Sequence, residues 1–198
     1  MPQKAPQEAV ETTASISPAR LAHVVLRTTQ YDAMVAWYRV VLCAWPTFEV
    51  PGALCFMTYD DEHHRVAIAN VPTLAERPDM AVGLEHVAFT YGTLGDLVAT
   101  YERLKPHGIE PYWTINHGPT ISFYYRDPDS NQIELQVDNF ATIEETNAFL
   151  AAEFPKNPIG VEIDPDDFVR RFRSGTPEPE LRKRPDTGAG GFDAVRTR

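Results

Sequence analysis

Apolar positions along the chain follow two spacings, one of period two and one of helical period. Residues 21–27 alternate well enough to predict a half-buried strand. From Asp32, which is placed to cap a helix, apolar side chains recur on one helical face until Pro46 closes the region. That face comprises Met34, Trp37, Tyr38, Val41 and Leu42. Three short strands are predicted next, at 48–50, 53–59 and 64–70.

The same order of elements then repeats. Residues 84–91 predict a strand, and the apolar spacing of 94–104 predicts an amphipathic helix ended by Pro106 and Gly108. Three more strands are predicted at 109–115, 120–126 and 132–137. The strongest internal match is Leu21-Ala-His23-Val-Val against Leu84-Glu-His86-Val-Ala. We therefore expect an α+β fold of two βαβββ modules, whose open sheets pair into a cup.

The remaining segments are expected to flank or join these modules. The predicted boundaries are a flexible N-terminal arm (1–17), the first module (18–73), a linker (74–82), the second module (83–139), and a C-terminal helix with an extended tail (140–198). The C-terminal helix is expected at 143–153, with Asp138 or Thr142 as its cap. Residues from Pro185 onward are interpreted as disordered. The tail contains three apolar residues that could anchor it, Phe168, Val169 and Phe172. Because the C-terminal helix and tail offer more apolar anchors than a monomer needs, we predict a homodimer or higher homo-oligomer.

Composition excludes some classes of protein. A formal net charge of −10 over 198 residues argues against nucleic-acid binding, which needs a positive surface. No apolar run approaches the roughly 18 residues needed to cross a membrane, and the N-terminus has no hydrophobic signal core. Cys43 and Cys55 lie inside apolar runs without metal-site spacing, so we expect both to be buried. These features together favour a cytoplasmic protein that binds neither nucleic acid nor membrane.

Three residues form a candidate metal site. His23 and His86 occupy matching places in the two repeats, so both are expected to point into the shared cup. Glu134 lies between Ile133 and Leu135 on the last predicted strand, and alternation therefore turns its carboxylate toward the cup. Two imidazoles and one carboxylate with open positions are the ligand set of non-haem Fe(II) oxygenases, although the same ligands suit Mn(II).

The two modules, each with a histidine in its first strand, resemble the vicinal oxygen chelate superfamily over about residues 21–138. The segment Ser122-Phe-Tyr-Tyr-Arg-Asp-Pro-Asp-Ser-Asn-Gln-Ile-Glu134-Leu carries the resemblance most clearly. Within the superfamily, three residues favour the type I extradiol (catechol ring-cleaving) dioxygenases in a single-module-pair form. His64 matches the histidine that serves as acid and base in these enzymes. His117 matches a histidine that lies just outside the metal ligands, and Tyr124 matches the tyrosine that hydrogen-bonds the substrate.

This resemblance implies a reaction and its participants. The expected substrates are a small aromatic diol and O₂, with Fe(II) as the cofactor. His64 would accept a substrate proton and later return one, while His117 and Tyr124 would donate hydrogen bonds to oxygen. The pocket walls are expected to include Trp113, Phe123 and Phe89. His63 is expected to face away from His64 if the strand has begun there, so it is left out of the site.

Other members of the superfamily remain alternatives. A glyoxalase normally uses four protein ligands, but the counterpart of Glu134 in the first repeat is about Ala67, which cannot bind metal. A fosfomycin-resistance enzyme needs cationic residues, and the segment after Glu134 offers none. An epimerase, or a metal-free binding protein of this fold, also stays open. The sequence departs from the pattern by Ser130 in the Asp-Ser-Asn turn and by added residues at 73–82.

Overall fold

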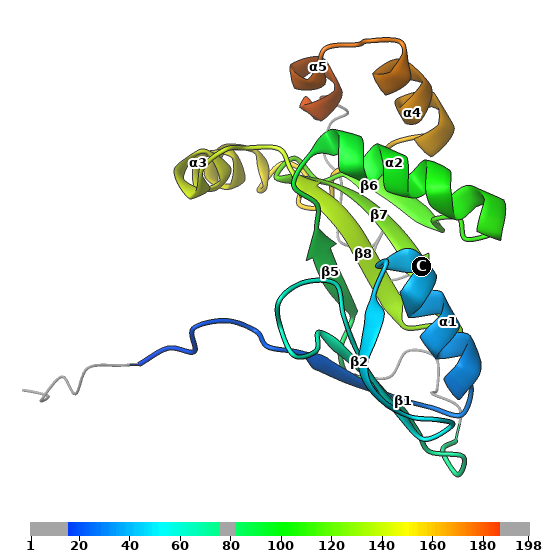
Figure 1. The fold of residues 1–198 in the computed structure, drawn as a ribbon. Helices are drawn as coiled ribbons and strands as arrows, with labels where there is room; N and C mark the ends of the chain where they lie inside the picture. The colour runs from blue at the N-terminus through cyan, green and yellow to red at the C-terminus, as the bar shows by residue number, and fades with distance from the viewer. Residues whose placement is uncertain (1–15, 76–81, 187–198) are drawn as a thin grey trace, which may run out of the picture.

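The computed structural model describes residues 16–75 and 82–186. Most of the predicted arm, the middle of the predicted linker and the last part of the predicted disordered end lie outside these residues. Two βαβββ units follow one another (Figure 1). The first consists of β1 (Val24–Thr28), α1 (Tyr31–Val41), β2 (Trp45–Val50), β3 (Leu54–Thr58) and β4 (Val66–Asn70). The second consists of β5 (His86–Thr90), α2 (Leu94–Leu104), the 3₁₀ turn η1 (Lys105–His107), β6 (Trp113–Asn116), β7 (Thr120–Arg126) and β8 (Gln132–Asp138).

Each unit forms its own sheet with the same internal order. The first sheet is β1-β4-β3-β2, and the second is β5-β8-β7-β6 with β9 (Val161–Glu162) added at its edge. β1 pairs parallel with β4, as β5 does with β8, and the other pairs are antiparallel. The repeat inferred from the sequence is therefore confirmed at the level of strand pairing, and so is the α+β class.

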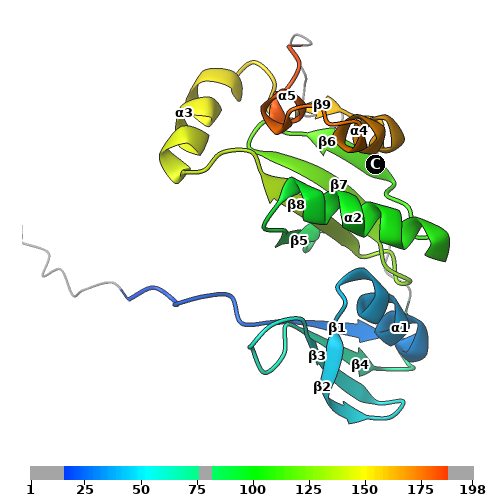
Figure 2. The same cartoon turned by 45° about the horizontal axis from the view of Figure 1, so that its top comes forward.

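The core lies between the two modules, on their helical sides. Figure 2 shows α1 and α2 between the two sheets. One continuous cluster of buried residues joins Met34 and Tyr38 of α1 to Leu97 of α2 and to Phe123 and Leu135 of the second sheet. Burial of these apolar surfaces supplies the main force that holds the modules together. The opposite face of each sheet is turned away from this shared core.

Hydrogen bonds fix the same packing. The hydroxyl of Tyr38 donates to Oδ2 of Asp127 over 3.1 Å in a buried position. Nε2 of Gln30 donates to the carbonyl oxygen of Pro128 (3.0 Å), and Arg103 donates to the last carbonyls of α1, at 3.1 Å for Val41. The β7–β8 turn and the end of α1 therefore act as the joints between the modules.

Two helix starts test the capping predictions. α1 begins at Tyr31 with Gln30 in the N-cap position and no side-chain cap, so Asp32 lies in the first turn and the prediction that it caps was wrong. α3 (Ile143–Glu153) has the predicted bounds, and Thr142 caps it in a capping box with Glu145. None of the described helices is long and apolar enough to span a membrane.

The C-terminal segment differs from the predicted extended tail. After α3 it forms β9, α4 (Pro165–Arg173) and α5 (Glu178–Arg182). Phe168 and Val169 are buried in the shared core, and Phe172 packs against it. These residues anchor the segment on its own chain, so they no longer support the expectation of an oligomer.

The two cysteines differ in their surroundings. Cys55 is fully buried in β3, as expected, whereas Cys43 is exposed, so the prediction that it is buried was wrong. Cys43 follows the end of α1 with a φ of +52°, a left-handed conformation that is common just after a helix.

Candidate functional site

The second sheet brings His86 and Glu134 together. Nε2 of His86 lies 2.9 Å from Oε2 of Glu134, and the carboxylate is buried, with 5% of the residue exposed. Ile133 and Leu135, its neighbours in β8, point into the core on the other side, as strand alternation predicts. Hydrogen bonding to Glu134 raises the pKa of His86. Burial opposes ionisation of Glu134, but hydrogen bonds from His86 and Ser122 hold its pKa below the usual value.

Tyr124 and His117 adjoin this pair. The ring of Tyr124 contacts that of His86 edge-on, with centroids 5.5 Å apart, and Trp113 stacks on it at 4.9 Å. Nε2 of His117 lies 3.0 Å from the hydroxyl of Tyr124. Burial raises the pKa of Tyr124, as does nearby Glu134, while burial lowers the pKa of His117. The phenol is therefore protonated and the imidazole neutral near pH 7.

The C-terminal segment positions His117. Nδ1 of His117 contacts the carbonyl oxygen of Ile159, which can only accept, so this nitrogen carries the hydrogen and Nε2 accepts from Tyr124. Nη1 of Arg184 donates to the carbonyls of His117 (3.1 Å) and Asn157 (2.9 Å). Sequence reasoning missed these residues, because nothing in the spacing of 157–160 or 184 marks a contact with the second sheet.

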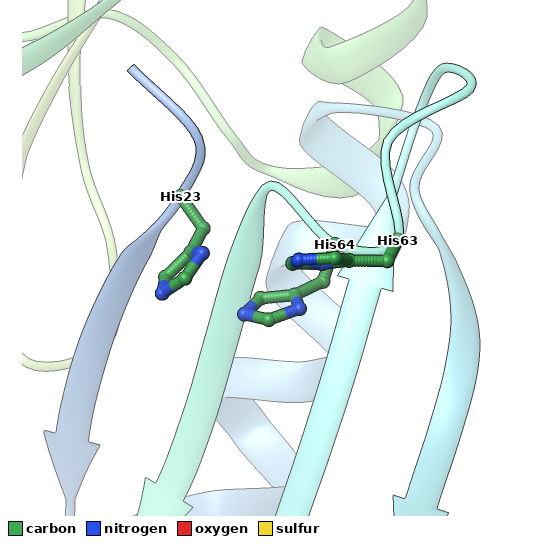
Figure 3. Close-up of side chains that lie close together, drawn as sticks. All are labelled: His23, His63 and His64. Atoms are coloured by element: carbon green, nitrogen blue, oxygen red, sulfur yellow. The ribbon is translucent and has the colours of Figure 1, made fainter. Parts of the chain in front are cut away.

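The first module holds a separate group of histidines. Among the described residues, His23, His63 and His64 form a group whose ligand atoms all lie within 4.8 Å of one another (Figure 3). The ring centroid of His64 is 4.1 Å from that of His23, and the ring stacks on Phe56 at 4.3 Å. Burial, and then the neighbouring charges of His23 and His63, lower the pKa of His64. This group is one candidate for binding a metal.

His63 was expected to face away from His64 if the strand had already begun there, and this condition is not met, because β4 begins later. The two ring centroids are 4.4 Å apart. The alternation rule applies only within a strand, and β4 begins at Val66, so both histidines lie in the turn before it. His23 likewise lies just before β1, which begins at Val24.

The predicted metal ligands are thus divided between two places. His86 and Glu134 are in direct contact, whereas His23 belongs to the group with His63 and His64. The donor types still fit a divalent metal, because a buried carboxylate beside an imidazole on an open sheet face offers two adjacent ligands. In register, Glu134 pairs with Ala88, two residues after His86, and Ala67 pairs with Val25, two residues after His23. Ala67 is therefore the counterpart of Glu134, as expected, and adds no ligand.

Only part of the predicted pocket wall lies beside this site. Trp113 stacks on Tyr124. Phe123 is fully buried in the core, and Phe89 packs against the same core and contacts Tyr59. Both phenylalanines alternate with site residues along their strands and so face the opposite side, which makes that part of the prediction wrong.

Comparison with known proteins identifies the relatives of the chain. A biphenyl-2,3-diol 1,2-dioxygenase 2 of Rhodococcus globerulus is 49% identical over 160 residues, which cover 80% of this chain and 84% of that protein. A biphenyl-2,3-diol 1,2-dioxygenase 3 of the same organism is 48% identical over 168 residues, or 83% of this chain and 88% of that protein.

Solved structures resemble the fold at lower identity. A glyoxylase/bleomycin resistance protein/dioxygenase domain from Frankia sp. EAN1pec has a TM-score of 0.52 at 19% identity and covers 62% of this chain and 99% of its own. The fosfomycin resistance protein FosX of Listeria monocytogenes has a TM-score of 0.51 at 21% identity, with 66% and 98% covered. The model of the glyoxalase/bleomycin resistance protein/dioxygenase superfamily matches residues 20–135. By this match and by its identity to the two dioxygenases, the chain belongs to the glyoxalase/bleomycin resistance protein/dioxygenase superfamily.

Proposed function

We propose that this chain is an extradiol dioxygenase, which cleaves the aromatic ring of a catechol-type substrate with O₂. The observation that carries the proposal is the cluster of His86, Glu134, Tyr124 and His117 on one face of the second sheet. The two relatives of nearly half-identical sequence support it, because both are named for dioxygenation of biphenyl-2,3-diol, an aromatic diol. The exposed free thiol of Cys43 suits the reducing cytoplasm proposed as its compartment.

His23, His86 and Glu134 are the proposed ligands of Fe(II). Two imidazoles and one carboxylate leave coordination positions for both oxygens of a diol and for O₂. When bound, the iron provides the route by which electrons pass from the diol to O₂. The same ligands suit Mn(II), so the choice of metal is part of the proposal.

The surrounding side chains have distinct proposed roles. Tyr124 keeps its proton because burial raises its pKa, and its hydroxyl is held by Nε2 of His117. A diol oxygen that binds nearby competes with His117 for this hydrogen and gains a hydrogen bond as it becomes negative. His64, whose pKa is lowered, is neutral near pH 7 and is the proposed acceptor of a substrate proton.

Metal content and turnover of matched variants test the proposal. The wild type is loaded anaerobically with Fe(II), and oxygen uptake and the yellow ring-cleavage product are followed with catechol, 3-methylcatechol and 2,3-dihydroxybiphenyl. Glu134→Ala is expected to lose iron and turnover. His63→Ala is the matched control and is expected to keep its iron, because His63 is not among the proposed ligands.

Two outcomes would contradict the proposal. A wild-type protein that binds iron but cleaves none of these diols would rule out the proposed reaction. Loss of iron in His63→Ala with full retention in Glu134→Ala would place the metal in the three-histidine group instead.

A further inference from the structure

The backbone just before β1 is held by a neighbouring side chain. β1 begins at Val24, so the ladder that pairs β1 with β4 does not include His23. Burial does not hold this segment either, because Leu21 is 74% exposed and His23 is exposed as well. The place of His23 therefore depends on other contacts, and the turn before β4 supplies them.

The guanidinium of Arg65 makes these contacts. Its Nη1 donates to the carbonyl oxygens of Leu21 (2.9 Å) and Ala22 (3.0 Å). The carbonyl of Ala22 belongs to the peptide group that joins it to His23, so this hydrogen bond fixes the plane of that peptide and the direction of the His23 side chain. Arg65 directly follows His64, whose ring centroid is 4.1 Å from that of His23. One side chain thus ties the residue before one histidine to the residue after the other.

Asp60 holds the guanidinium of Arg65 in this place. Nε of Arg65 donates to Oδ2 of Asp60 over 3.0 Å, and Nη2 lies 2.9 Å from the same oxygen. The planar guanidinium is thereby fixed at two of its nitrogens. Oδ1 of Asp60 accepts from the amide of Glu62 and from the hydroxyl of Thr58, both over 3.1 Å. The carboxylate is thus anchored in the turn that leads to His64, and it balances the positive charge of Arg65.

A second ion pair joins the same two segments but holds them less firmly. Nε of Arg20 lies 3.3 Å from Oε2 of Glu62, and 63% of the Arg20 side chain is exposed. Such exposed pairs add little, because water screens the charges and the long side chain loses freedom. Only 17% of the Arg65 side chain is exposed, and it binds one carboxylate and two carbonyls. Arg65 is therefore the main connection between the start of β1 and the turn before β4.

We propose that Arg65 is a positioning residue of the site, an inference that rests on the proposed function. Its guanidinium sets the place of His23, a proposed iron ligand, relative to His64, the proposed proton acceptor. Figure 3 shows these two rings beside each other at one end of the first sheet. A shift of His23 changes the affinity for iron, and it also changes the distance that a proton of the bound diol travels to His64. Loss of the Arg65 contacts therefore weakens iron binding and slows turnover, while the fold remains.

Two substitutions of Arg65 test this role. Arg65→Met removes every hydrogen bond of the guanidinium, whereas Arg65→Lys keeps the charge but lacks the planar fork that reaches the carboxylate and the carbonyls together. The Kd for Fe(II) is measured anaerobically by competition with a chelator, and kcat and KM are measured with 3-methylcatechol at saturating iron. Arg65→Met is expected to raise the Kd and lower kcat by about 10–100-fold each, with KM unchanged. Arg65→Lys is expected to lie between Arg65→Met and the wild type.

Arg173→Met is the matched control. Nε of Arg173 likewise donates to a carboxylate, that of Glu102 over 3.0 Å, but this pair joins α4 to α2 and is expected to leave the Kd and kcat unchanged. Imidazole signals in the NMR spectrum of the metal-free protein give a readout that depends on neither iron nor turnover. The ring of His23 lies against that of His64, so its signals should move toward those of a free histidine in Arg65→Met and stay in place in Arg173→Met.

The outcomes separate this inference from the proposed function. An unchanged iron Kd with unchanged His23 signals in Arg65→Met, or equal changes in Arg173→Met, would overturn the positioning role and leave the dioxygenase proposal in place. If Arg65→Met does not fold by circular dichroism, Arg65→Lys decides, and wild-type Kd, kcat and His23 signals in that variant would overturn the role. A wild-type protein that binds no iron would overturn the proposed function, and the His23 signals would still decide whether Arg65 holds this residue in place.

Discussion

Gly160 lies where the C-terminal segment passes closest to the second sheet, and its replacement tests whether this contact positions His117. Its φ is +117°, and a Cβ added there would lie 2.4 Å from the carbonyl oxygen of Asn116 and 2.7 Å from Cα of His117. These distances fall about 1 Å short of the ~3.5 Å at which non-bonded atoms normally settle. Both neighbours are backbone atoms, so the segment itself must shift.

The expected loss of stability has two parts. A side chain at a positive φ costs about 1–2 kcal/mol, and overpacking adds about 1–3 kcal/mol. Gly160→Ala should therefore lower the free energy of unfolding by about 2–5 kcal/mol. Gly108→Ala is the matched control, since Gly108 has a φ of +69° but nothing within 4 Å of an added Cβ. This variant should lose only the stability that the positive φ costs.

Urea denaturation measures the free energy of unfolding of both variants. Turnover shows separately whether the substitution disturbs the site. Gly160→Ala displaces the carbonyl of Ile159 that accepts from His117, so its turnover should fall while its iron content stays at the wild-type level. Gly108→Ala should keep both its turnover and its iron content at the wild-type level. Equal losses of stability in the two variants, or unchanged turnover in Gly160→Ala, would refute the argument that this close approach positions His117.

Three further outcomes follow from the same contacts. Tyr38→Phe should destabilise the chain by about 1.5–3 kcal/mol in urea denaturation, because it removes a buried hydrogen bond to the carboxylate of Asp127; a loss below about 0.5 kcal/mol would show that this joint is unimportant. Tyr124→Phe should keep its iron and lose turnover, and a variant with wild-type turnover would exclude the hydroxyl from the reaction. Chelated, metal-free protein should stay folded by circular dichroism, and Fe(II) at 100 times its Kd should add about 2.7 kcal/mol of stability, or roughly 5–10 °C in Tm. Unfolding on chelation would show that the core depends on the metal.

Much of the local structure could be predicted from the spacing of apolar residues. β7 and α3 have the predicted bounds, and the counterpart of Glu134 was placed correctly at Ala67. These features depend on neighbours along one strand or helix, which a periodic pattern records directly. His63 shows where that information ends, because the alternation rule does not apply in the turn before β4.

The arrangement of the two modules could not be predicted in the same way. A repeat shows that the same unit occurs twice, but not which faces of the two units meet. In the first sheet both faces are apolar, with Cys55 and Met57 on the core side and Phe48 and Val50 on the other. An apolar pattern therefore allows either face to be buried, and only the packing of α1 against α2 shows which one is covered within the chain.

The two modules differ at the register position that carries the buried carboxylate. The second sheet carries the buried carboxylate, whereas the first has Ala67 at the same register position. The proposed ligand set of His23, His86 and Glu134 therefore contains one carboxylate. A carboxylate at position 67 would add a second one to this set and occupy a position that the diol or O₂ needs. A small apolar residue there keeps these coordination positions open. The difference between the two repeats at this position thus serves the coordination of the metal.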